Sequence, residues 1–288
     1  MNKIIILLFL ISIHFTLFAQ ENLIVAVAKQ NGDIVEVKAK LRSPMVGVEE
    51  AKRKDVFGNS KPIDYITHIK VMYDKDIVFD LTTCQYLAAF SRIDFQYHKL
   101  NNTDTLKFFT TDHKNKTFQR NVKIKNFTPQ KSLLKHDNQV HLPIVYNQEV
   151  WKAKTVNKAI NILYAPTKKI QKENLLKVKT LPKDFFNTGN EDINYIQSSR
   201  NTVIYIQTDI ALESIAILSD RNRYSLAGLL TIPANAIINY TLAVKTGAAC
   251  CQGEAVITVI AKGIDGTLYI DESVPLTLAC STTDGSCY

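Results

Sequence analysis

Short runs in which apolar and polar side chains alternate dominate the sequence from residue 20 onward. In the first half, such runs occupy residues 24–28, 34–41, 65–73, 77–81 and 118–125. A period of two is typical of half-buried β-strands, and polar turn sequences rather than helices separate the runs. Short strands at this spacing predict an antiparallel β-sandwich of immunoglobulin type over residues 20–127.

A second set of strand-like runs begins near residue 168. These runs occupy residues 175–181, 201–208, 213–219, 226–232, 237–245, 254–262 and 267–279. Their number suits a second seven-stranded sandwich of the same type. The chain is therefore predicted to be an all-β protein with two immunoglobulin-like β-sandwich domains.

Between the two sets, the alternation fades over residues 128–150, which we interpret as a linker. The following stretch, residues 151–164, carries the one convincing helical pattern, which Pro166 ends. The apolar residues at helical spacing are Trp151, Val156, Ala159, Ile160 and Leu163. We expect this face to pack against a sheet, so the second domain comprises the helix and a sandwich over residues 151–288.

The first 19 residues have the composition of a secretory signal peptide. Lys3 is followed by an apolar run from Ile4 to Ile13 and by Leu-Phe-Ala before Gln20. The apolar run is short for a membrane span, and no later segment is apolar enough to cross a bilayer. We therefore expect cleavage of residues 1–19, a periplasmic or extracellular location, and no membrane span.

Charge and composition narrow the function classes. The formal net charge is +8 and 46% of the residues are hydrophobic, so the chain can bury a core and attract anions. The basic residues are scattered, which argues against nucleic acid as a partner. Histidines at metal-ligand spacing, phosphate loops and nucleophile motifs are absent from the sequence. We accordingly predict no cofactor, no metal site and no catalytic residues.

Five cysteines remain after signal cleavage, an odd number for an oxidising compartment. At least one thiol is therefore unpaired within a monomer. Cys84 lies in an apolar strand-like region and is expected to be a buried structural thiol. The other cysteines are Cys250, Cys251, Cys280 and Cys287.

Topology predicts that three of these cysteines lie near one another. If residues 239–246, 254–262 and 267–279 are successive antiparallel strands, their connections alternate between the ends of the sandwich. The loop with Cys250 and Cys251 then lies where the last strand ends at Cys280, so one of the pair could form a disulfide with Cys280. Cys287 would remain free on a small polar tail with a reach of about 23 Å.

A series of short motifs runs through the first half: Leu-Arg-Ser-Pro-Met at residues 41–45, Arg-Lys-Asp with a Gly turn at residues 53–58, and Asp-His-Lys-Asn-Lys at residues 112–116. Together they resemble the pattern of the SoxZ family, the scaffold partner in a sulfur-oxidation carrier complex. The residues that match the family pattern are Pro44, Met45, Arg53, Lys54, Asp55, Gly58 and Pro62, and more loosely Asp112, Lys114 and Asn115. The resemblance covers nearly the whole first domain and implies a scaffold role for it.

Three stretches of the second half follow one another in a familiar order: Thr-Val-Asn-Lys-Ala-Ile in the predicted helix, residues 213–222, and the last predicted strand leading to Cys280. In this order they look like SoxY, the carrier subunit, so that the chain resembles a SoxZ–SoxY fusion. In SoxY that strand leads into Gly-Gly-Cys-Gly-Gly, whose cysteine bears the sulfur cargo. Here the flanking glycines are absent and a longer tail ends at Cys287 and Tyr288.

The resemblance implies a covalent sulfur carrier rather than an enzyme. The carrier cysteine would be Cys287 or Cys280, with Cys250 and Cys251 as disulfide-forming or auxiliary thiols. Thiosulfate-derived sulfur would be the cargo, and the Sox cytochrome and the sulfate-releasing hydrolase would be the partners. Lys245 could help to attract the anionic cargo.

Two alternative functions remain open from the sequence. One is a structural or interaction protein in which the tail cysteines are all in disulfides. The other is a thiol–disulfide oxidoreductase that uses Cys250–Cys251 or Cys280–Cys287 as its redox pair. A count of free thiols and an assay with small dithiols distinguish these classes from a carrier.

Overall fold

The computed structural model describes ten segments of the chain. They are residues 23–54, 57–99, 103–129, 147–165, 170–171, 179–180, 196–198, 201–246, 253–272 and 276–279. The predicted signal peptide and most of the predicted linker lie outside them. So do Cys250, Cys251, Cys280 and Cys287.

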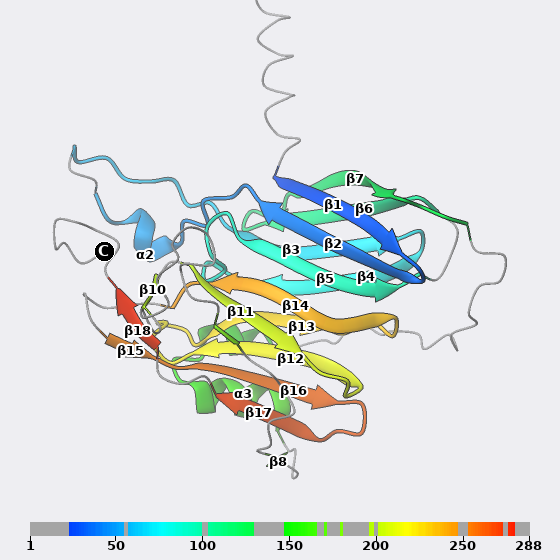
Figure 1. Ribbon diagram of the computed structural model, residues 1–288. Coiled ribbons are helices and arrows are strands. Elements are labelled where there is room, and N and C mark those ends of the chain that lie inside the picture. The colour runs from blue at the N-terminus through cyan, green and yellow to red at the C-terminus, as the bar shows by residue number, and fades with distance from the viewer. Residues whose placement is uncertain are drawn as a thin grey trace, which may run out of the picture.

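The first half of the chain forms a sandwich of seven strands and one short helix (Figure 1). The strands are β1 (Ile24–Asn31), β2 (Ile34–Leu41), β3 (Ile66–Tyr73), β4 (Asp76–Thr83), β5 (Arg92–His98), β6 (Thr105–Asp112) and β7 (Thr117–Lys125). Helix α2 (Val48–Ala51) lies between β2 and β3. The alternating runs named from the sequence are confirmed as strands, whereas the sequence reading did not single out β5 and β6.

The second half contributes a 3₁₀ helix, one α-helix and the remaining strands. They are η1 (Gln148–Lys152), α3 (Val156–Tyr164), β8 (Ile170–Gln171), β9 (Lys179–Thr180), β10 (Ile196–Ser198), β11 (Thr202–Gln207), β12 (Leu212–Ser219), β13 (Leu226–Thr231), β14 (Ala236–Val244), β15 (Gly253–Ala255), β16 (Ile257–Gly263), β17 (Leu268–Glu272) and β18 (Leu276–Ala279). The predicted all-β class is thus confirmed.

The helix is shorter than the sequence predicted. Residues 148–152 form a 3₁₀ turn, Ala153 is extended, and the α-helix begins only at Val156. The reason is the side chain of Thr155, which accepts a hydrogen bond from the backbone N–H of Lys158 and so caps the first turn. The predicted apolar face is correct, because Val156, Ala159 and Leu163 belong to a core cluster against the sheet.

The two sandwiches share both of their sheets. One layer runs β17-β16-β12-β13-β4-β3-β6, and the other runs β1-β2-β5-β14-β11-β9. Strand β7 joins the layers at the far edge, because it pairs antiparallel with β6 and parallel with β1. The seams between the halves are the antiparallel pairs β4–β13 and β5–β14. Figure 1 shows the strands stacked from one half into the other without a break.

One hydrophobic core fills the space between the layers across both halves. Phe79 of β4 stacks on Phe95 of β5 with ring centroids 4.6 Å apart. Tyr240 of β14, from the second half, meets the edge of Phe79 at 6.0 Å. All three are buried within a single cluster that also contains residues of β12 and β16. The fold is therefore one long sandwich built from two immunoglobulin-like halves.

Candidate functional site

The described part of the C-terminal region ends in a small separate sheet. Strand β18 pairs antiparallel with β15, with Gly253 opposite Leu278 and Ala255 opposite Leu276, and it pairs in parallel with β10. Gly253 is the first described residue after the segment with Cys250 and Cys251, and Ala279 is the last before Cys280. Gly253 and Ala279 therefore lie close together in this small sheet.

Residues 254–262 and 267–279 were each predicted to be one strand, but each is divided between two sheets: β15 and β18 belong to the small sheet, and β16 and β17 belong to one layer of the sandwich. Strand β16 pairs antiparallel with β17, as expected. However, β14 pairs with β5 and β11, and the described residues give it no ladder with β15 or β16. Strand β14 therefore lies in one layer and β16 in the other, while β15 belongs to the small separate sheet.

A turn at residues 220–225 ties this end of the second sandwich to the first. Asp220 accepts a hydrogen bond from the backbone N–H of Val256, directly after β15, at 2.8 Å. Arg223 forms an ion pair with Glu49 of helix α2, and Asn222 donates to the carbonyl of Lys245 at 3.1 Å. The turn is therefore a junction between the halves.

Lys245 is the second link between the halves. Its ammonium group lies 3.0 Å from a carboxylate oxygen of Glu50 and also donates to the carbonyl of Met45. The side chain is only 14% exposed, so the ion pair is largely shielded from water. Because Glu50 neutralises it, Lys245 serves the junction rather than the anionic cargo that the sequence suggested. In the sequence, the adjacent acidic residues Glu49 and Glu50 were the feature that could have indicated a partner for Lys245, and they were not singled out.

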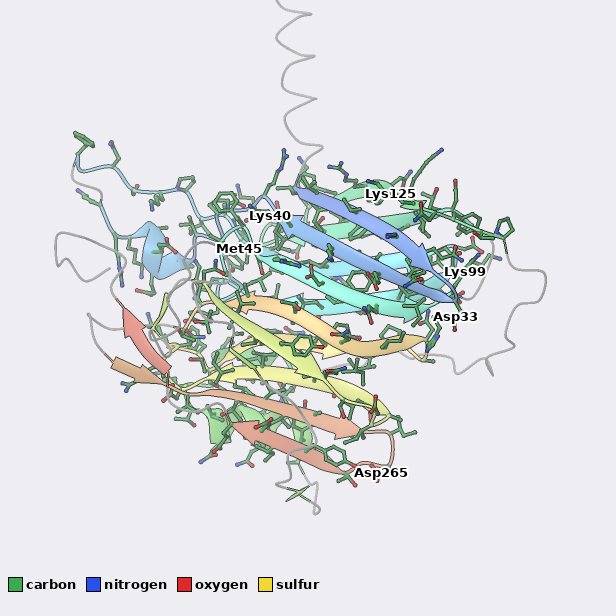
Figure 2. All side chains as sticks on the ribbon, viewed as in Figure 1. Asp33, Lys40, Met45, Lys99, Lys125 and Asp265 are labelled. Atoms are coloured by element: carbon green, nitrogen blue, oxygen red, sulfur yellow. The ribbon has the colours of Figure 1, made fainter. Side chains whose placement is uncertain are left out.

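Met45 has an uncommon backbone conformation at this junction. Its φ is +52°, in the left-handed region that residues other than glycine adopt rarely. Its sulfur accepts the backbone N–H of Ile66 at 3.3 Å, and the residue is fully buried. Figure 2 places Met45 where the first sandwich meets helix α2. Contacts from both halves maintain this backbone conformation, the Ile66 N–H from the first and the Lys245 ammonium group from the second.

Cys84 follows β4 by one residue and is half-buried at the same junction. Its thiol donates to the carbonyl of Leu226 in β13 at 3.4 Å. Burial raises the pKa of Cys84 to about 12, although a hydrogen bond from the Tyr86 backbone and the charge of Lys245 act in the opposite direction. A thiol that stays protonated is a poor nucleophile, which fits the structural role predicted for it.

The structure leaves the other predicted site residues untested. Cys250, Cys251, Cys280 and Cys287 lie outside the described residues, so neither a free thiol nor a disulfide is assigned to them. Within the described segments, no group of three or more His, Cys, Asp or Glu side chains is arranged to hold a metal ion. Nor does any helix of those segments have the length and apolarity to cross a membrane.

The fold and the junction define a class: a protein of two immunoglobulin-like sandwiches that share their sheets. Residues 24–123, about a third of the chain, match the family model of the sulphur oxidation protein SoxZ. The first sandwich is therefore a SoxZ-like domain, as its sequence resemblance indicated. The match ends near the end of β7 and does not extend into the second sandwich.

The other comparisons add no further relationship. No curated protein matches the chain. Among solved structures, the fibronectin(III)-like modules of CbhA from Clostridium thermocellum are 11% identical, with 92% of this chain and 97% of that chain covered. The TM-score is 0.23, and we base no argument on this similarity.

Proposed function

We propose that the chain is a periplasmic sulfur carrier in which both subunits of a SoxY–SoxZ pair are fused. It would hold thiosulfate-derived sulfur on a cysteine of its C-terminal tail and present it to Sox enzymes. One observation carries the proposal: a SoxZ-like domain shares both of its sheets with a second sandwich. The last described strand of that second sandwich ends at Ala279, one residue before Cys280.

The chemistry needs one accessible thiolate. Its sulfur would form a bond to the outer sulfur of thiosulfate, giving an S-thiosulfonate, while two electrons pass to the Sox cytochrome. Water would then cleave the S–SO₃ bond in the hydrolase, releasing sulfate and leaving a persulfide on the carrier. The carrier itself supplies only the attachment point, so we assign it no catalytic residues.

The register of β15 and β18 supports a disulfide at the base of the tail. Gly253 lies opposite Leu278 and Glu254 opposite Thr277. If this ladder continues by two residues, position 251 is paired with position 280. Directly opposite residues in antiparallel strands have Cα atoms about 4.5–5.5 Å apart, within the range of a disulfide. We therefore favour Cys251 over Cys250 as the partner of Cys280.

With that disulfide formed, Cys287 is our first choice for the carrier thiol. It lies seven positions after Cys280, which gives a reach of about 23 Å at roughly 3.3 Å per residue. The intervening residues are small and polar, as in flexible linkers. A tethered thiol can visit separate active sites while remaining at high effective concentration.

Intact-mass spectrometry tests the proposal directly. The full chain is incubated with thiosulfate and the Sox cytochrome, and the adduct is located by peptide mapping. We expect one thiosulfonate adduct, which Cys287→Ser abolishes and Cys250→Ser retains. Loss of the adduct only in Cys280→Ser would contradict our choice of cysteine. Absence of any titratable tail thiol after mild reduction would favour the non-carrier interaction protein.

The disulfide has its own matched pair of variants. Cys251→Ser should release Cys280 as an additional titratable thiol in the native protein. Cys250→Ser should instead remove one thiol, because Cys250 is unpaired in this scheme. The reverse result would exchange the roles of the two neighbours. Rapid turnover of small dithiols by the wild type would indicate an oxidoreductase.

A further inference from the structure

The strands that lead to the tail form one long antiparallel hairpin in two parts. In the inner part, β16 pairs with β17, and Thr258 lies opposite Glu272. In the outer part, β15 pairs with β18, and Ala255 lies opposite Leu276. Figure 1 shows β15 leading directly into β16. The two ladders are therefore successive parts of the same two chain segments, although they belong to different sheets.

The register of this hairpin changes by one residue between its two parts. Between the paired positions 255 and 258 the first segment has two residues, whereas between positions 272 and 276 the second segment has three. One residue more on one strand than on the other is the count of a β-bulge, which redirects the strand beyond it. Without this change, the inner register would place position 275 opposite Ala255, where the structure has Leu276.

This shift bears on the two adjacent cysteines of the proposed disulfide. Both lie outside the described residues, so their positions follow only by extension of the two ladders. The outer register, extended by two residues, pairs position 251 with position 280. The inner register, extended without the shift, would instead pair position 250 with position 280. The register of β15 against β18 therefore decides which of Cys250 and Cys251 is offered to Cys280.

Asp220 holds the residue that lies between the two ladders. The ladder of β12 with β16 ends where Ser219 lies opposite Ile257. Beyond that pair, the backbone N–H of Asp220 donates to the carbonyl of Val256 at 3.2 Å. The backbone N–H of Val256 donates in return to the Asp220 carboxylate at 2.8 Å. One residue thus binds both backbone polar groups of Val256 and fixes the point where β15 leaves β16.

The turn that carries Asp220 is itself anchored. At its start, Ser219 donates its backbone N–H to the carbonyl of Ser225 at 2.8 Å. Within it, Arg223 forms the ion pair with Glu49 of helix α2 in the first half. The bonds to Val256 therefore tie the hairpin to an ordered junction, and a slip of the first segment by one residue would break them.

The outer ladder is too short to specify its register alone. Strand β15 has three residues, including Gly253, and β18 has four. Pairing register is weakly specified in strands that contain glycine and offer few contacts. Strand β10 pairs with β18 and, among the described residues, forms no ladder with β15. The register of β15 consequently depends on where its junction with β16 is held.

We propose that Asp220 is a positioning residue that fixes the register of β15 against β18, and so selects Cys251 over Cys250 as the partner of Cys280. This inference rests on the proposed function, to which it adds the residue that selects the disulfide. The bond forms by exchange with a small disulfide such as oxidised glutathione, which is reduced to two thiols as the two cysteine sulfurs join. Without Asp220, the outer ladder slips toward the unshifted register and Cys250 competes for Cys280.

The register is tested first with engineered cysteines, in the full-length chain with Cys250, Cys251, Cys280 and Cys287 replaced by serine. Glu254→Cys with Thr277→Cys puts thiols at opposite positions of the observed ladder. Glu254→Cys with Leu276→Cys puts them opposite in the unshifted register. Oxidised glutathione closes either pair, and mass spectrometry of non-reduced peptides gives the rates. We expect the first pair to close about tenfold faster than the second.

The ratio of these two rates reports on Asp220. Asp220→Ala removes the acceptor for the Val256 N–H and should lower the ratio about fivefold. Asp220→Asn keeps a side-chain carbonyl oxygen and should hold the ratio within about twofold of the parent. Asp112→Ala is the matched control, because its carboxylate also accepts backbone N–H groups, from Lys114 and Lys116 at 2.8 and 2.9 Å. It should leave the ratio unchanged, since a general loss of stability affects both pairs alike.

The natural disulfide is then mapped with all five cysteines present. Non-reduced peptides of the wild type should contain the Cys251–Cys280 bond. In Asp220→Ala, the share of Cys250–Cys280 should rise about fivefold, while Asp220→Asn should match the wild type. Far-ultraviolet circular dichroism checks that each variant is folded.

The outcomes separate this inference from the carrier function. Equal rate ratios in Asp220→Ala and Asp112→Ala would overturn the positioning role and leave the carrier proposal standing. Faster closure of the Leu276→Cys pair in the parent would overturn the shifted register. A wild type in which Cys280 is bonded to neither neighbour would overturn the selection of Cys251. Absence of the thiosulfonate adduct with the disulfide and the rate ratios as expected would overturn the carrier function alone.

Discussion

The two sandwiches are continuous in both sheets but differ in what covers the outer face of one layer. In the first, strands such as β3 and β5 alternate between buried and half-buried residues, because one face meets the core and the other meets solvent. In the second, β13 is buried throughout and β12 nearly so, because η1 and α3 pack on the outer face. The helices cover this face in the second sandwich, whereas the corresponding face of the first sandwich meets solvent.

This difference also explains which sequence signals were clear. Alternation is visible where only one face is buried, as in Ile-Val-Glu-Val-Lys-Ala-Lys-Leu of β2. It disappears in Leu-Ala-Gly-Leu-Leu-Thr of β13, which lies between the core and the helix layer. Near-continuous apolar strands are what burial on both faces requires. A run of this kind therefore indicates a covering element elsewhere in the chain.

The largest effect is expected from a substitution that tests whether the two sandwiches share one core. Phe79→Ala removes a fully buried ring that contacts both Phe95 and Tyr240. We expect a loss of about 3–5 kcal/mol in the free energy of unfolding. Urea unfolding followed by Trp151 fluorescence reports on the second sandwich, because Trp151 is the only tryptophan. Its transition should shift to lower urea together with the far-ultraviolet circular dichroism signal.

A matched substitution controls for the loss of an aromatic ring. Phe90→Ala removes a side chain that is 53% exposed, so the change should be below about 1 kcal/mol. An unshifted Trp151 transition in Phe79→Ala would show that the halves unfold independently. In that case the two shared sheets would not make the sandwiches one cooperative unit.

A smaller effect is expected at the ion pairs that join the halves. Glu50→Gln removes the negative partner of Lys245, whose side chain is 14% exposed, and leaves that ammonium without its countercharge. We expect a loss of about 1–3 kcal/mol in the free energy of unfolding. Glu149→Gln is the control, because its pair with Lys152 is 63% and 70% exposed and should contribute below about 1 kcal/mol. Equal effects in urea unfolding would refute a special role for the junction.

The smallest effect concerns Cys84 and appears only at alkaline pH. Its pKa is raised from 9.0 to about 12, so between these values the folded protein binds more protons than the unfolded chain. Stability is therefore unaffected below pH 9 and falls as pH rises through this window. Cys84→Ser keeps a donor for the Leu226 carbonyl and removes the titration. From pH 7.5 to 10.5 the wild type should lose about 1 kcal/mol more than the variant, after allowance for partial exposure.

Thiol labelling gives an independent check on Cys84. The native protein should leave Cys84 unmodified by iodoacetamide at pH 8, and unfolding in urea should expose it. This separation matters for the test of the proposed carrier function, because any thiol counted under native conditions then belongs to the region after Val244. Fast native labelling of Cys84 would place a reactive thiol at the junction and would contradict its assignment as structural.

By itself, the sequence determined the all-β class, most strand positions and the helix face that packs on the sheet. These features follow from local periodicity, because the spacing of apolar residues decides which face of a strand or helix is buried. Local motifs such as Arg53-Lys54-Asp55 and Gly58 also indicated that the first half is similar to SoxZ, and the family model matches that half. The onset of α3 was missed by five residues, because the Thr155 cap outweighed the apolar pattern.

Only the tertiary structure decided how the halves join. The period of a strand fixes its buried face but not its neighbour, so nothing local predicts that β4 pairs with β13 or β5 with β14. The same holds for Glu50 and Lys245, which lie 195 residues apart and meet at 3.0 Å. Edge pairing and charge pairing depend on which surfaces the whole chain brings together.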